Sequence, residues 1–225
     1  MALKLVIGNK NYSSWSMRPW LALRANNIEF EEVFIPLYTG AAGKQRILDV
    51  SRAGKVPVLI DGDIRVWESL AIMEYLAEKF PSAGLWPKDA AARAHARAIA
   101  SEMHAGFLPL RRLLPMNIWR PVKARPLDDG AKADVARIDA IWSDCRARYA
   151  AGGPFLFGAF CAADAMYAPV IWRLRTYAVE VGAPARAYME TMMALPAWNE
   201  WAAAARREPW VLPHDEVDWP QVLRE

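Results

Sequence analysis

The sequence predicts a chain of two parts, an α/β domain followed by an all-helical domain. In the first part, short apolar runs with strand spacing and longer runs with helical spacing follow one another in the order β-α-β-α-β-β-α. In the second part, apolar residues recur only at helical spacing. We therefore expect an α/β domain over residues 1–80, a linker over 81–88 and a helical domain over 89–225.

The first strand and the first helix are predicted at the N-terminal end of the chain. Leu3, Leu5 and Ile7 occupy every second position, which is the spacing of one face of a strand. Residues 9–14 follow as a polar loop, and apolar residues then repeat at helical spacing. Pro19 falls in the first turn of that helix, where its missing N–H is tolerated.

The rest of the first part completes the sheet and adds two helices. A second strand is predicted over residues 30–35 and a short, irregular helix over 41–50. Residues 58–60 form a hairpin with residues 64–66 across an Asp-Gly turn. The third helix is expected over residues 69–79.

The second part is predicted to contain at least five helices. Its first apolar stripe is interpreted as one helix and contains Ile99, Met103, Phe107, Leu110 and Leu114. A second stripe runs from Val135 to Tyr149, after a loop rich in proline and arginine. Further helices are expected over residues 162–177, 184–195 and 197–206, and the tail over 208–225, which includes Trp219, is expected to wrap the surface.

Composition and charge exclude several classes of protein. The formal net charge is +3, and residues 1–80 carry 10 basic and 9 acidic side chains, so neither half is strongly charged. This balance argues against nucleic acid and a membrane surface as partners. The opening residues lack the charged region and apolar core of a signal peptide. We therefore expect a cytoplasmic protein.

The cysteine and histidine residues predict neither a disulfide framework nor a metal site. Cys145 and Cys161 stand far apart in the chain. His95, His104 and His214 show no metal-ligand spacing.

Two stretches of the first part carry the residues that point to a binding site. A strand headed by Pro57 needs a reason, because proline cannot donate to a sheet. If the Val56-Pro57 bond is cis, the Val56 backbone N–H and C=O face outward, where an extended peptide can pair with them. Glu68 and Ser69 stand where a strand becomes a helix, and Ser69 is expected to cap that helix and to leave N–H groups aimed at an anion.

Together with the segment from Asn11 to Arg18, these stretches resemble the glutathione site of the cytosolic glutathione S-transferase family, serine type. The resemblance covers nearly the whole chain. It implies a thioredoxin-like N-terminal domain, an all-helical C-terminal domain, glutathione as co-substrate and no metal. It also implies a buried capping box in the central helix, for which the match is Cys161 to Asp164, with a thiol in place of a hydroxyl.

The resemblance assigns glutathione contacts to five residues. A Val/Ile-Pro pair with cis proline binds the glutathione backbone in that family, and here the pair is Val56-Pro57. A Glu/Gln-Ser pair twelve residues further on binds the γ-glutamyl end, and here it is Glu68-Ser69. Lys55 matches a lysine of tau-like members that meets the glycyl carboxylate, and Lys44 is a weaker candidate for that contact.

A glutathione enzyme must stabilise the thiolate, because a free thiol has a pKa near 8.5. Lowering that pKa by about two units takes about 2.7 kcal/mol, which one hydrogen bond to a charged acceptor can supply. Tau-like and zeta-like patterns place the active serine five residues before an arginine and select Ser13 ahead of Arg18. Theta-like and delta-like patterns select Ser14, which we expect otherwise to cap the helix. Tyr12 is a further candidate donor or a wall of the site.

The acceptor substrate is expected between the two domains. The candidate contacts on the first stripe of the helical domain are Met103, Phe107 and Arg111, which follow one another at a spacing of four, with His104 adjacent. Trp15 and Tyr12 are candidates from the first domain. Arg18 is expected to brace the domain through an ion pair.

These residues predict a glutathione transferase that adds the glutathione thiolate to a small hydrophobic or anionic electrophile. The resemblance implies a homodimer. A zeta-like isomerase of maleylacetoacetate or maleylpyruvate is the first alternative, although Trp15 stands where that class has cysteine and Thr176 where we align its substrate arginine. The second alternative is a non-catalytic binding protein of the same fold.

Overall fold

Four short strands form one mixed sheet in the order β2-β1-β3-β4, in a computed structural model that describes residues 2–217. Strand β1 (Lys4–Ile7) pairs in parallel with β2 (Glu31–Phe34) and antiparallel with β3 (Val58–Asp61). Strand β4 (Ile64–Trp67) completes the predicted hairpin with β3. The expected order of strands and helices in the first part is confirmed.

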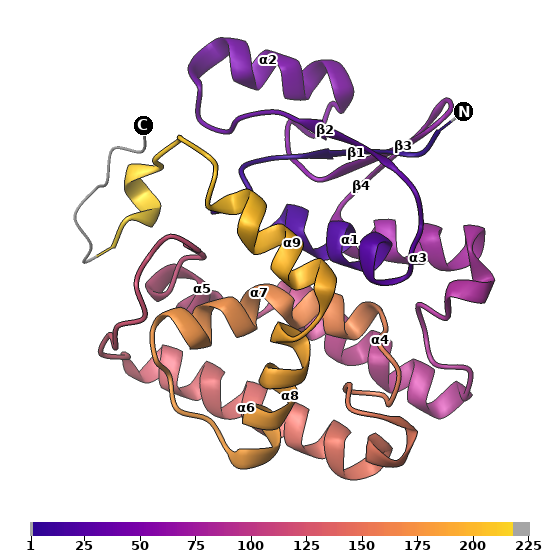
Figure 1. Ribbon diagram of the computed structural model, residues 1–225, viewed down its shortest axis with the longest axis vertical. Coiled ribbons are helices and arrows are strands. Elements are labelled where there is room, and N and C mark those ends of the chain that lie inside the picture. The colour runs from indigo at the N-terminus through magenta and orange to yellow at the C-terminus, as the bar shows by residue number, and fades with distance from the viewer. Residues whose placement is uncertain (1, 218–225) are drawn as a thin grey trace.

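Helices cover both faces of this sheet. Helix α2 (Gly40–Val50) lies on one face, and α1 (Ser14–Ala25) and α3 (Ser69–Lys79) lie on the other (Figure 1). The alternation along β1 divides its side chains between two apolar clusters, because successive strand residues point to opposite faces. Val6 belongs to the small cluster that also contains Ile47 of α2, whereas Leu5 belongs to the large one that contains α1.

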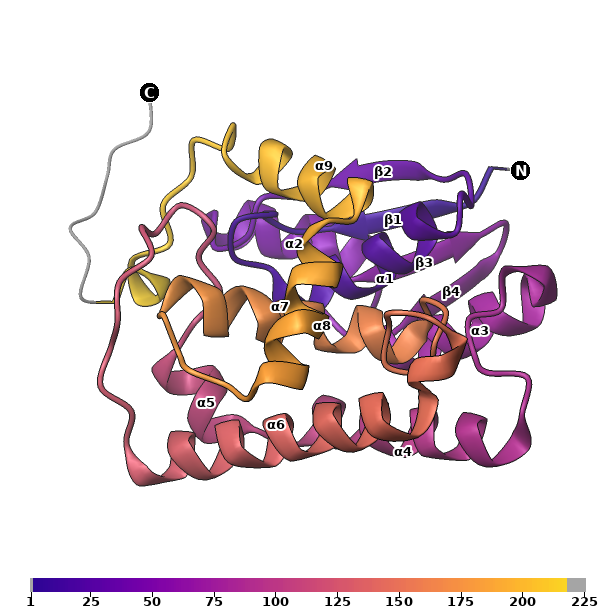
Figure 2. The same ribbon diagram turned by 60° about the horizontal axis from the view of Figure 1, so that its bottom comes forward.

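The second part is all-helical within residues 89–217. Its α-helices are α4 (Ala90–Ala105), α5 (Leu108–Leu113), α6 (Asp129–Tyr149), α7 (Ala162–Thr176), α8 (Ala183–Met193) and α9 (Pro196–Ala205). Figure 2 shows α7 between the sheet side of the molecule and the α4–α6 layer. Of the fifteen residues of α7, only Arg175 is not buried. This helix packs against both α1 and α4, so one apolar core runs from the sheet into the helical part. The division into domains at residues 81–88 stays a prediction.

The first helical stripe is broken, which corrects the expectation of one helix from Ile99 to Leu114. Helix α4 ends at Ala105, and α5 begins at Leu108. At Gly106 a Cβ atom would lie 2.7 Å from the Glu102 carbonyl oxygen, so only glycine fits there. Phe107 then adopts φ 57°, outside the α-helical region. The periodic apolar pattern continues across the break, which is why the sequence did not reveal it.

The predicted capping box is present at the start of α7. The Asp164 carboxylate accepts hydrogen bonds from the Cys161 N–H (2.8 Å) and the Leu156 N–H (3.1 Å). Burial raises the pKa of Asp164 to about 6. A carboxyl group that is wholly buried thus holds two backbone donors that would otherwise lack partners.

Beyond α9 the chain returns to the first part of the molecule. The 3₁₀ turn η3 (Pro213–Asp215) brings the His214 ring to 4.5 Å from the Tyr38 ring, and Trp210 lies 5.1 Å from Phe34, between ring centres. The predicted wrapping of the tail is therefore seen as far as residue 217, and Trp219 lies outside the described residues. Within residues 2–217, no helix has both the length and the apolarity needed to span a bilayer.

Candidate functional site

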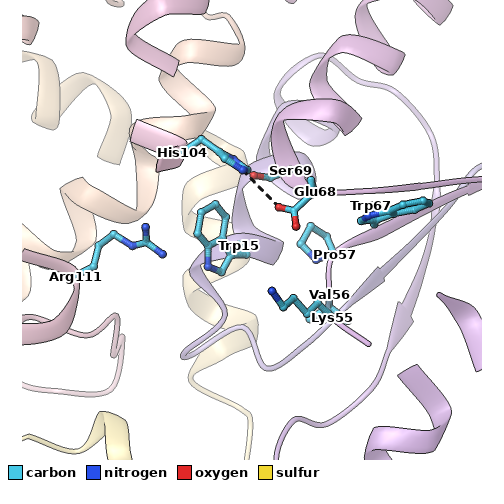
Figure 3. A pocket seen from close by; sticks show the side chains of 9 residues that line it. All are labelled: Trp15, Lys55, Val56, Pro57, Trp67, Glu68, Ser69, His104 and Arg111. Atoms are coloured by element: carbon cyan, nitrogen blue, oxygen red, sulfur yellow. Dashed lines mark ion pairs between the residues drawn. The ribbon is translucent and has the colours of Figure 1, made fainter. Parts of the chain in front are cut away.

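Two adjoining cavities lie beside Trp15 and Val56, one reaching α4 and α5 and the other reaching α2 and the C-terminal tail. The smaller one, the Glu68 cavity, has a volume of about 310 Å³ and is lined by Trp15, Lys55, Val56, Pro57, Trp67, Glu68, Ser69, His104 and Arg111 (Figure 3). The larger one, the Ser13 cavity, has a volume of about 680 Å³, and its lining includes Tyr12, Ser13, Ser14, Tyr38, Lys44 and Asp215. Trp15, Lys55 and Val56 line both cavities.

The Glu68 cavity brings together the five residues for which the sequence predicts glutathione contacts. The Val56-Pro57 bond is cis, as expected. Within residues 2–217, no hydrogen bond engages the N–H or C=O of Val56. Because Val56 is half-buried at the wall of both cavities, these groups are available to an extended ligand.

The start of α3 differs in one detail from the expectation. Glu68 is the N-cap residue, with φ 68°, and Ser69 is the first helical residue. The prediction that Ser69 caps the helix is therefore wrong. Ser69 is buried, and its hydroxyl lies 3.8 Å from the Met166 sulfur. It still stands at the helix N-terminus, where N–H groups favour an anion.

In the Ser13 cavity, three groups form a hydrogen-bonded chain. The Ser13 hydroxyl donates to the Ser16 Oγ at 2.7 Å, and the Gly8 N–H donates to the same oxygen at 3.1 Å. Ser13 is also the N-cap of α1 and accepts from the Ser16 N–H, whereas Ser14 is the first helical residue. The expectation that Ser14 caps this helix is therefore wrong, and Ser13 does so. Both serines are 7% exposed and line the cavity.

Tyr12 lines the Ser13 cavity, but its hydroxyl is engaged elsewhere. This hydroxyl donates to the Glu216 carboxylate in the C-terminal tail, and the Asn117 side-chain amide donates to the other oxygen of that carboxylate at 3.0 Å. The bonded hydroxyl makes Tyr12 a wall of the site.

Trp15 lies between the two parts of the chain and contacts three side chains that carry or can carry charge. The His104 ring lies 5.2 Å from the Trp15 ring, edge-on. The guanidinium carbons of Arg18 and Arg111 lie 4.0 and 4.7 Å from the centre of the indole ring. Both distances are within the range of a cation–π interaction. Trp15 thus connects α1 with α4 and α5.

Arg18 does not form the ion pair that the sequence predicts. Among residues 2–217 no carboxylate lies within 4 Å of its guanidinium group. Its Nε donates instead to the Met166 carbonyl oxygen of α7 at 3.0 Å. Arg18 therefore joins the two parts of the molecule through a backbone acceptor and through Trp15.

His104 faces Glu68 across the smaller cavity, and Figure 3 marks this contact with a dashed line. The His104 Nε2 and the Glu68 Oε2 lie 3.5 Å apart. Burial lowers the pKa of His104; the charge of Glu68 opposes this shift, and those of Arg18 and Arg111 add to it. A histidine with a pKa below its usual 6.5 is mainly neutral at pH 7.

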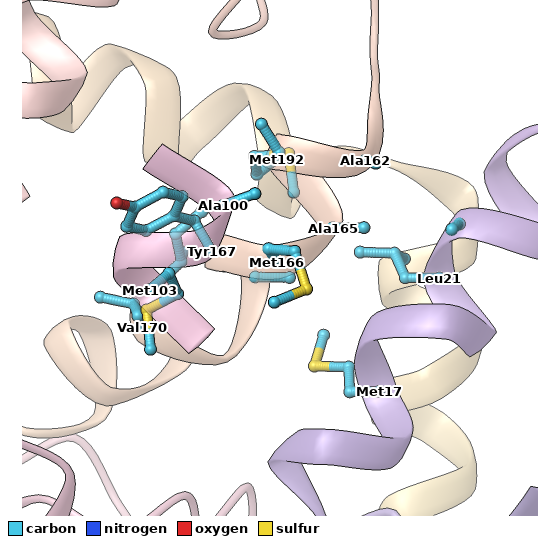
Figure 4. Close-up of a cluster of buried hydrophobic side chains, with 14 of the residues drawn as sticks. Met17, Leu21, Ala100, Met103, Ala162, Ala165, Met166, Tyr167, Val170 and Met192 are labelled. Atoms are coloured by element: carbon cyan, nitrogen blue, oxygen red, sulfur yellow. The ribbon is translucent and has the colours of Figure 1, made fainter. Parts of the chain in front are cut away.

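The predicted acceptor contacts divide between the cavities and the core. Trp15, Tyr12 and Arg111 line the cavities. Met103 and Phe107 line neither of them and belong to the large apolar cluster. Figure 4 shows Met103 on α4 beside Val170 and Tyr167, and it is wholly buried. Because the chain breaks at Gly106, Phe107 does not continue the α4 face on which the spacing places it.

Several lining residues have no clear signal in the sequence. Trp67 ends β4 and is half exposed beside Glu68, and Tyr38 precedes α2. Asp215 reaches the Ser13 cavity from the tail. His104 is adjacent to the predicted stripe, which is the only indication of it. Only the fold brings these residues to the cavities.

Two sequence-family models match the chain. The model for the glutathione S-transferase N-terminal domain matches residues 12–79, and the model for the C-terminal domain matches residues 122–204. Together the matches cover about two thirds of the chain. The chain belongs to the glutathione S-transferase family.

Curated relatives within this family match part of the chain. A probable maleylacetoacetate isomerase of Caenorhabditis elegans is 38% identical over 113 residues, which is 50% of this chain and 52% of the relative. Glutathione S-transferase 1 of Dianthus caryophyllus is 34% identical over 114 residues, which is 51% of this chain and 52% of the relative. The chain thus matches about half the length of these relatives.

Solved structures share the fold over nearly the whole chain. A glutathione transferase homolog from Burkholderia GL BGR1 with bound glutathione gives a TM-score of 0.67 at 23% identity, over 91% of this chain and 97% of that one. A tau class glutathione S-transferase of mango (Mangifera indica) gives a TM-score of 0.65 at 22% identity, over 91% of this chain and 97% of that one. The predicted transferase fold, a thioredoxin-like domain followed by a helical one, is confirmed.

Proposed function

We propose that this member of the glutathione S-transferase family is a glutathione transferase, in which the glutathione thiolate attacks a small electrophile. The observation that carries the proposal is the meeting of two cavities at Val56. One contains the groups suited to the γ-glutamyl end, and the other contains two buried serines. The unpaired backbone of Val56 lies between them, where the middle of a tripeptide would pair with it.

In this proposal the first part of the chain binds glutathione through groups of opposite sign at its two ends. Glu68 would bind the γ-glutamyl ammonium group, and Ser69 at the start of α3 would bind the α-carboxylate. Lys55 and Lys44 both line the Ser13 cavity and would bind the glycyl carboxylate. The cysteinyl sulfur then lies near Ser13.

Ser13 would activate the thiol by donating a hydrogen bond to its anion. Its hydroxyl can do so only if Ser16 donates to Ser13, because the two hydroxyls share one bond. In the structure the Ser13 hydroxyl donates to the Ser16 Oγ, so binding of the sulfur would reverse this bond while the Gly8 N–H continues to donate to Ser16. A chain of three donors then points at the sulfur, and each bond polarises the next. We expect this chain and the start of α1 to lower the pKa of bound glutathione.

The chemical step is a nucleophilic substitution or addition at carbon. The sulfur lone pair forms the C–S bond, and in a substitution the leaving group departs with the electron pair of the bond that breaks. The proton of the thiol has left for solvent before this step. The protein supplies position and a stabilised thiolate.

Isomerisation is a second candidate, favoured by the Caenorhabditis elegans relative described as a probable maleylacetoacetate isomerase. The pair Ser13-Ser14 supports it. Against it, Trp15 fills the position expected for cysteine, and Thr176 stands where we align the substrate arginine of that class. A homodimer in the cytoplasm remains our expectation from the family.

Binding and titration test the proposal together. The protein should be retained on immobilised glutathione and released by S-methylglutathione, and the ultraviolet absorbance of bound thiolate should titrate below pH 8.5. Conjugation of neutral aryl halides should follow. A protein that binds glutathione but leaves the thiol pKa unchanged would be a binding module. Turnover of maleyl acids without conjugation would favour the isomerase.

A further inference from the structure

Two arginine side chains contact Trp15, and a third lies near them on another helix. Arg18 comes from α1, Arg111 from α5 and Arg173 from α7. Arg18 and Arg111 contact the Trp15 ring, and Arg173 lies close enough for its charge to act on Arg18. The fold thus concentrates positive charge at one wall of the Glu68 cavity.

These guanidinium groups lack counter-ions among residues 2–217. None of the three has a carboxylate within 4 Å in the described part of the chain. Arg18 is wholly buried and both of its terminal nitrogens lack a hydrogen-bond partner, as does the Nε of Arg173, which is 5% exposed. The side chain of Arg111 donates only to the Gly106 carbonyl oxygen, at 3.4 Å.

The Glu68 and Asp215 carboxylates lie near this region, and each has a histidine neighbour. Glu68 faces His104, and the carboxylate of Asp215 lies 3.3 Å from the Nε2 of His214. Burial lowers the pKa of Arg173 to about 10; the charge of Arg111 adds to this shift, and the charge of Asp215, more than 4 Å away, opposes it. A buried charge without a partner destabilises the protein, so a bound anion would relieve the repulsion.

We propose that Arg111 binds a carboxylate of the acceptor substrate, with Arg18 and Arg173 strengthening that contact through their charge. This inference rests on the proposed function and names its substrate class as anionic electrophiles. Arg111 makes the contact, because it is half-buried and lines the cavity. In Figure 3 its side chain reaches toward Trp15 from the side away from Glu68 and Pro57.

The position of Arg111 favours the acceptor over glutathione as the source of the carboxylate. Glutathione would meet Ser69 and the start of α3 at one carboxylate and the lysines Lys44 and Lys55 at the other. Arg111 belongs to the helical part, beyond Trp15. Since Trp15 lines both cavities, a carboxylate at Arg111 leaves the rest of the acceptor beside Trp15 and directed toward Ser13.

A matched pair of acceptors tests the proposal by activity. In para-chloro-meta-nitrobenzoate and its methyl ester, the thiolate forms a C–S bond at the ring carbon that bears chlorine, and chloride leaves with the electron pair. Each kcat/KM is divided by the rate constant of the uncatalysed reaction. The wild type should favour the acid, and Arg111→Met should lower this preference by about ten- to a hundredfold, the range for a charged hydrogen bond. Arg111→Lys should keep part of it.

Arg112→Met is the matched control, because Arg112 is exposed on the same helix and lines neither cavity. It should leave the preference for the acid unchanged. If Arg111→Met and Arg112→Met lowered the preference for the acid equally, the preference would come from the overall positive charge of the region, and the proposal would be overturned.

Binding gives a readout that does not need turnover. Benzoate and benzamide are titrated by calorimetry into the protein saturated with S-methylglutathione. Benzoate should bind, and Arg111→Met should weaken it about tenfold or more, whereas benzamide should bind weakly to both proteins. If benzoate binds the free protein but not the protein saturated with S-methylglutathione, or if Arg111→Met loses glutathione affinity, Arg111 belongs to the glutathione site and the proposal is overturned. If glutathione does not bind at all, the proposed function fails, and benzoate titrated into the free protein still decides the anion site.

Discussion

The two halves of the site recognise ligands by different means. In the first half, formed by the ends of β3, β4 and the loop before α1, the candidate binding groups are backbone atoms, hydroxyls and a helix N-terminus, with Glu68 at one end and Lys44 and Lys55 at the other. In the second half, formed by α4 and α5 with α7 behind them, they are charged side chains, of which Arg111 has no counter-ion among the described residues. Backbone groups suit a peptide that is the same in every reaction. The charged side chains of the second half, in contrast, can be substituted without disturbing the sheet.

The largest expected effect is at Ser13. Ser13→Ala should raise the pKa of bound glutathione by about one to two units and lower activity at neutral pH by about ten- to a hundredfold. The pKa of the thiol is raised in this variant, so the loss should be greatest at low pH and should diminish as pH rises past the new pKa. Thiolate absorbance against pH measures this directly.

Ser14→Ala and Tyr12→Phe are the controls for that measurement. Ser14 does not cap the helix, and the Tyr12 hydroxyl is bonded to Glu216. We expect less than a twofold change in the activity of Tyr12→Phe. A shifted titration in Ser14→Ala with an unshifted one in Ser13→Ala would transfer the role to Ser14.

A second prediction concerns Asp164 in the helical part, which should affect the stability of the fold and not the chemistry at Ser13. Because burial raises the pKa of Asp164 to about 6, the folded state holds that proton more tightly than the unfolded chain. Its contribution to folding is therefore most favourable below about pH 4 and is lost as pH rises through about 6. The free energy of unfolding of the wild type, relative to Asp164→Asn, should fall by about 2 kcal/mol across this range in urea titrations. If this difference in the free energy of unfolding did not change with pH, the hydrogen bonds from the two N–H groups would cancel the effect of burial on the pKa of Asp164.

Glu68→Ala should affect binding alone. Glu68 lies at the far end of the proposed glutathione site from Ser13, so its contact is equally strong before and during reaction. We expect the KM for glutathione to rise about tenfold and kcat to change less than twofold. Steady-state kinetics with varied glutathione measures both. A strong loss of kcat at unchanged KM would contradict the division of the site.

The smallest expected effect is at Ser16. Ser16→Ala removes the hydroxyl that would donate to Ser13 once the thiolate is bound, but leaves the Ser13 hydroxyl in place. The pKa of bound glutathione should rise by about half a unit, and activity at neutral pH should fall about threefold. Ser16→Thr should recover most of this loss, since it restores the hydroxyl. An unchanged pKa in Ser16→Ala would show that Ser13 acts alone.

The sequence predicted that several residues of the first half lie together, because they are close in the chain. Val56, Pro57, Glu68 and Ser69 belong to one hairpin and the helix after it, so local rules for turns and helix starts fix their relative positions. The sequence did not identify the capping residues of α1 and α3. Which serine caps α1 depends on a difference of one residue, and helix boundaries are not resolved to that precision from sequence.

The second half depended on the tertiary structure. Apolar periodicity determined that residues after 89 fold as helices, since helices bury an apolar stripe whatever lies opposite. It did not determine which side chains of the stripe reach a cavity. The first stripe breaks at Gly106, where a Cβ would meet the Glu102 carbonyl oxygen; Met103 before the break packs in the core, and Arg111 after it reaches Trp15. The convergence of Arg18, Arg111 and Arg173 needs three helices placed by packing, and no spacing in the sequence encodes it.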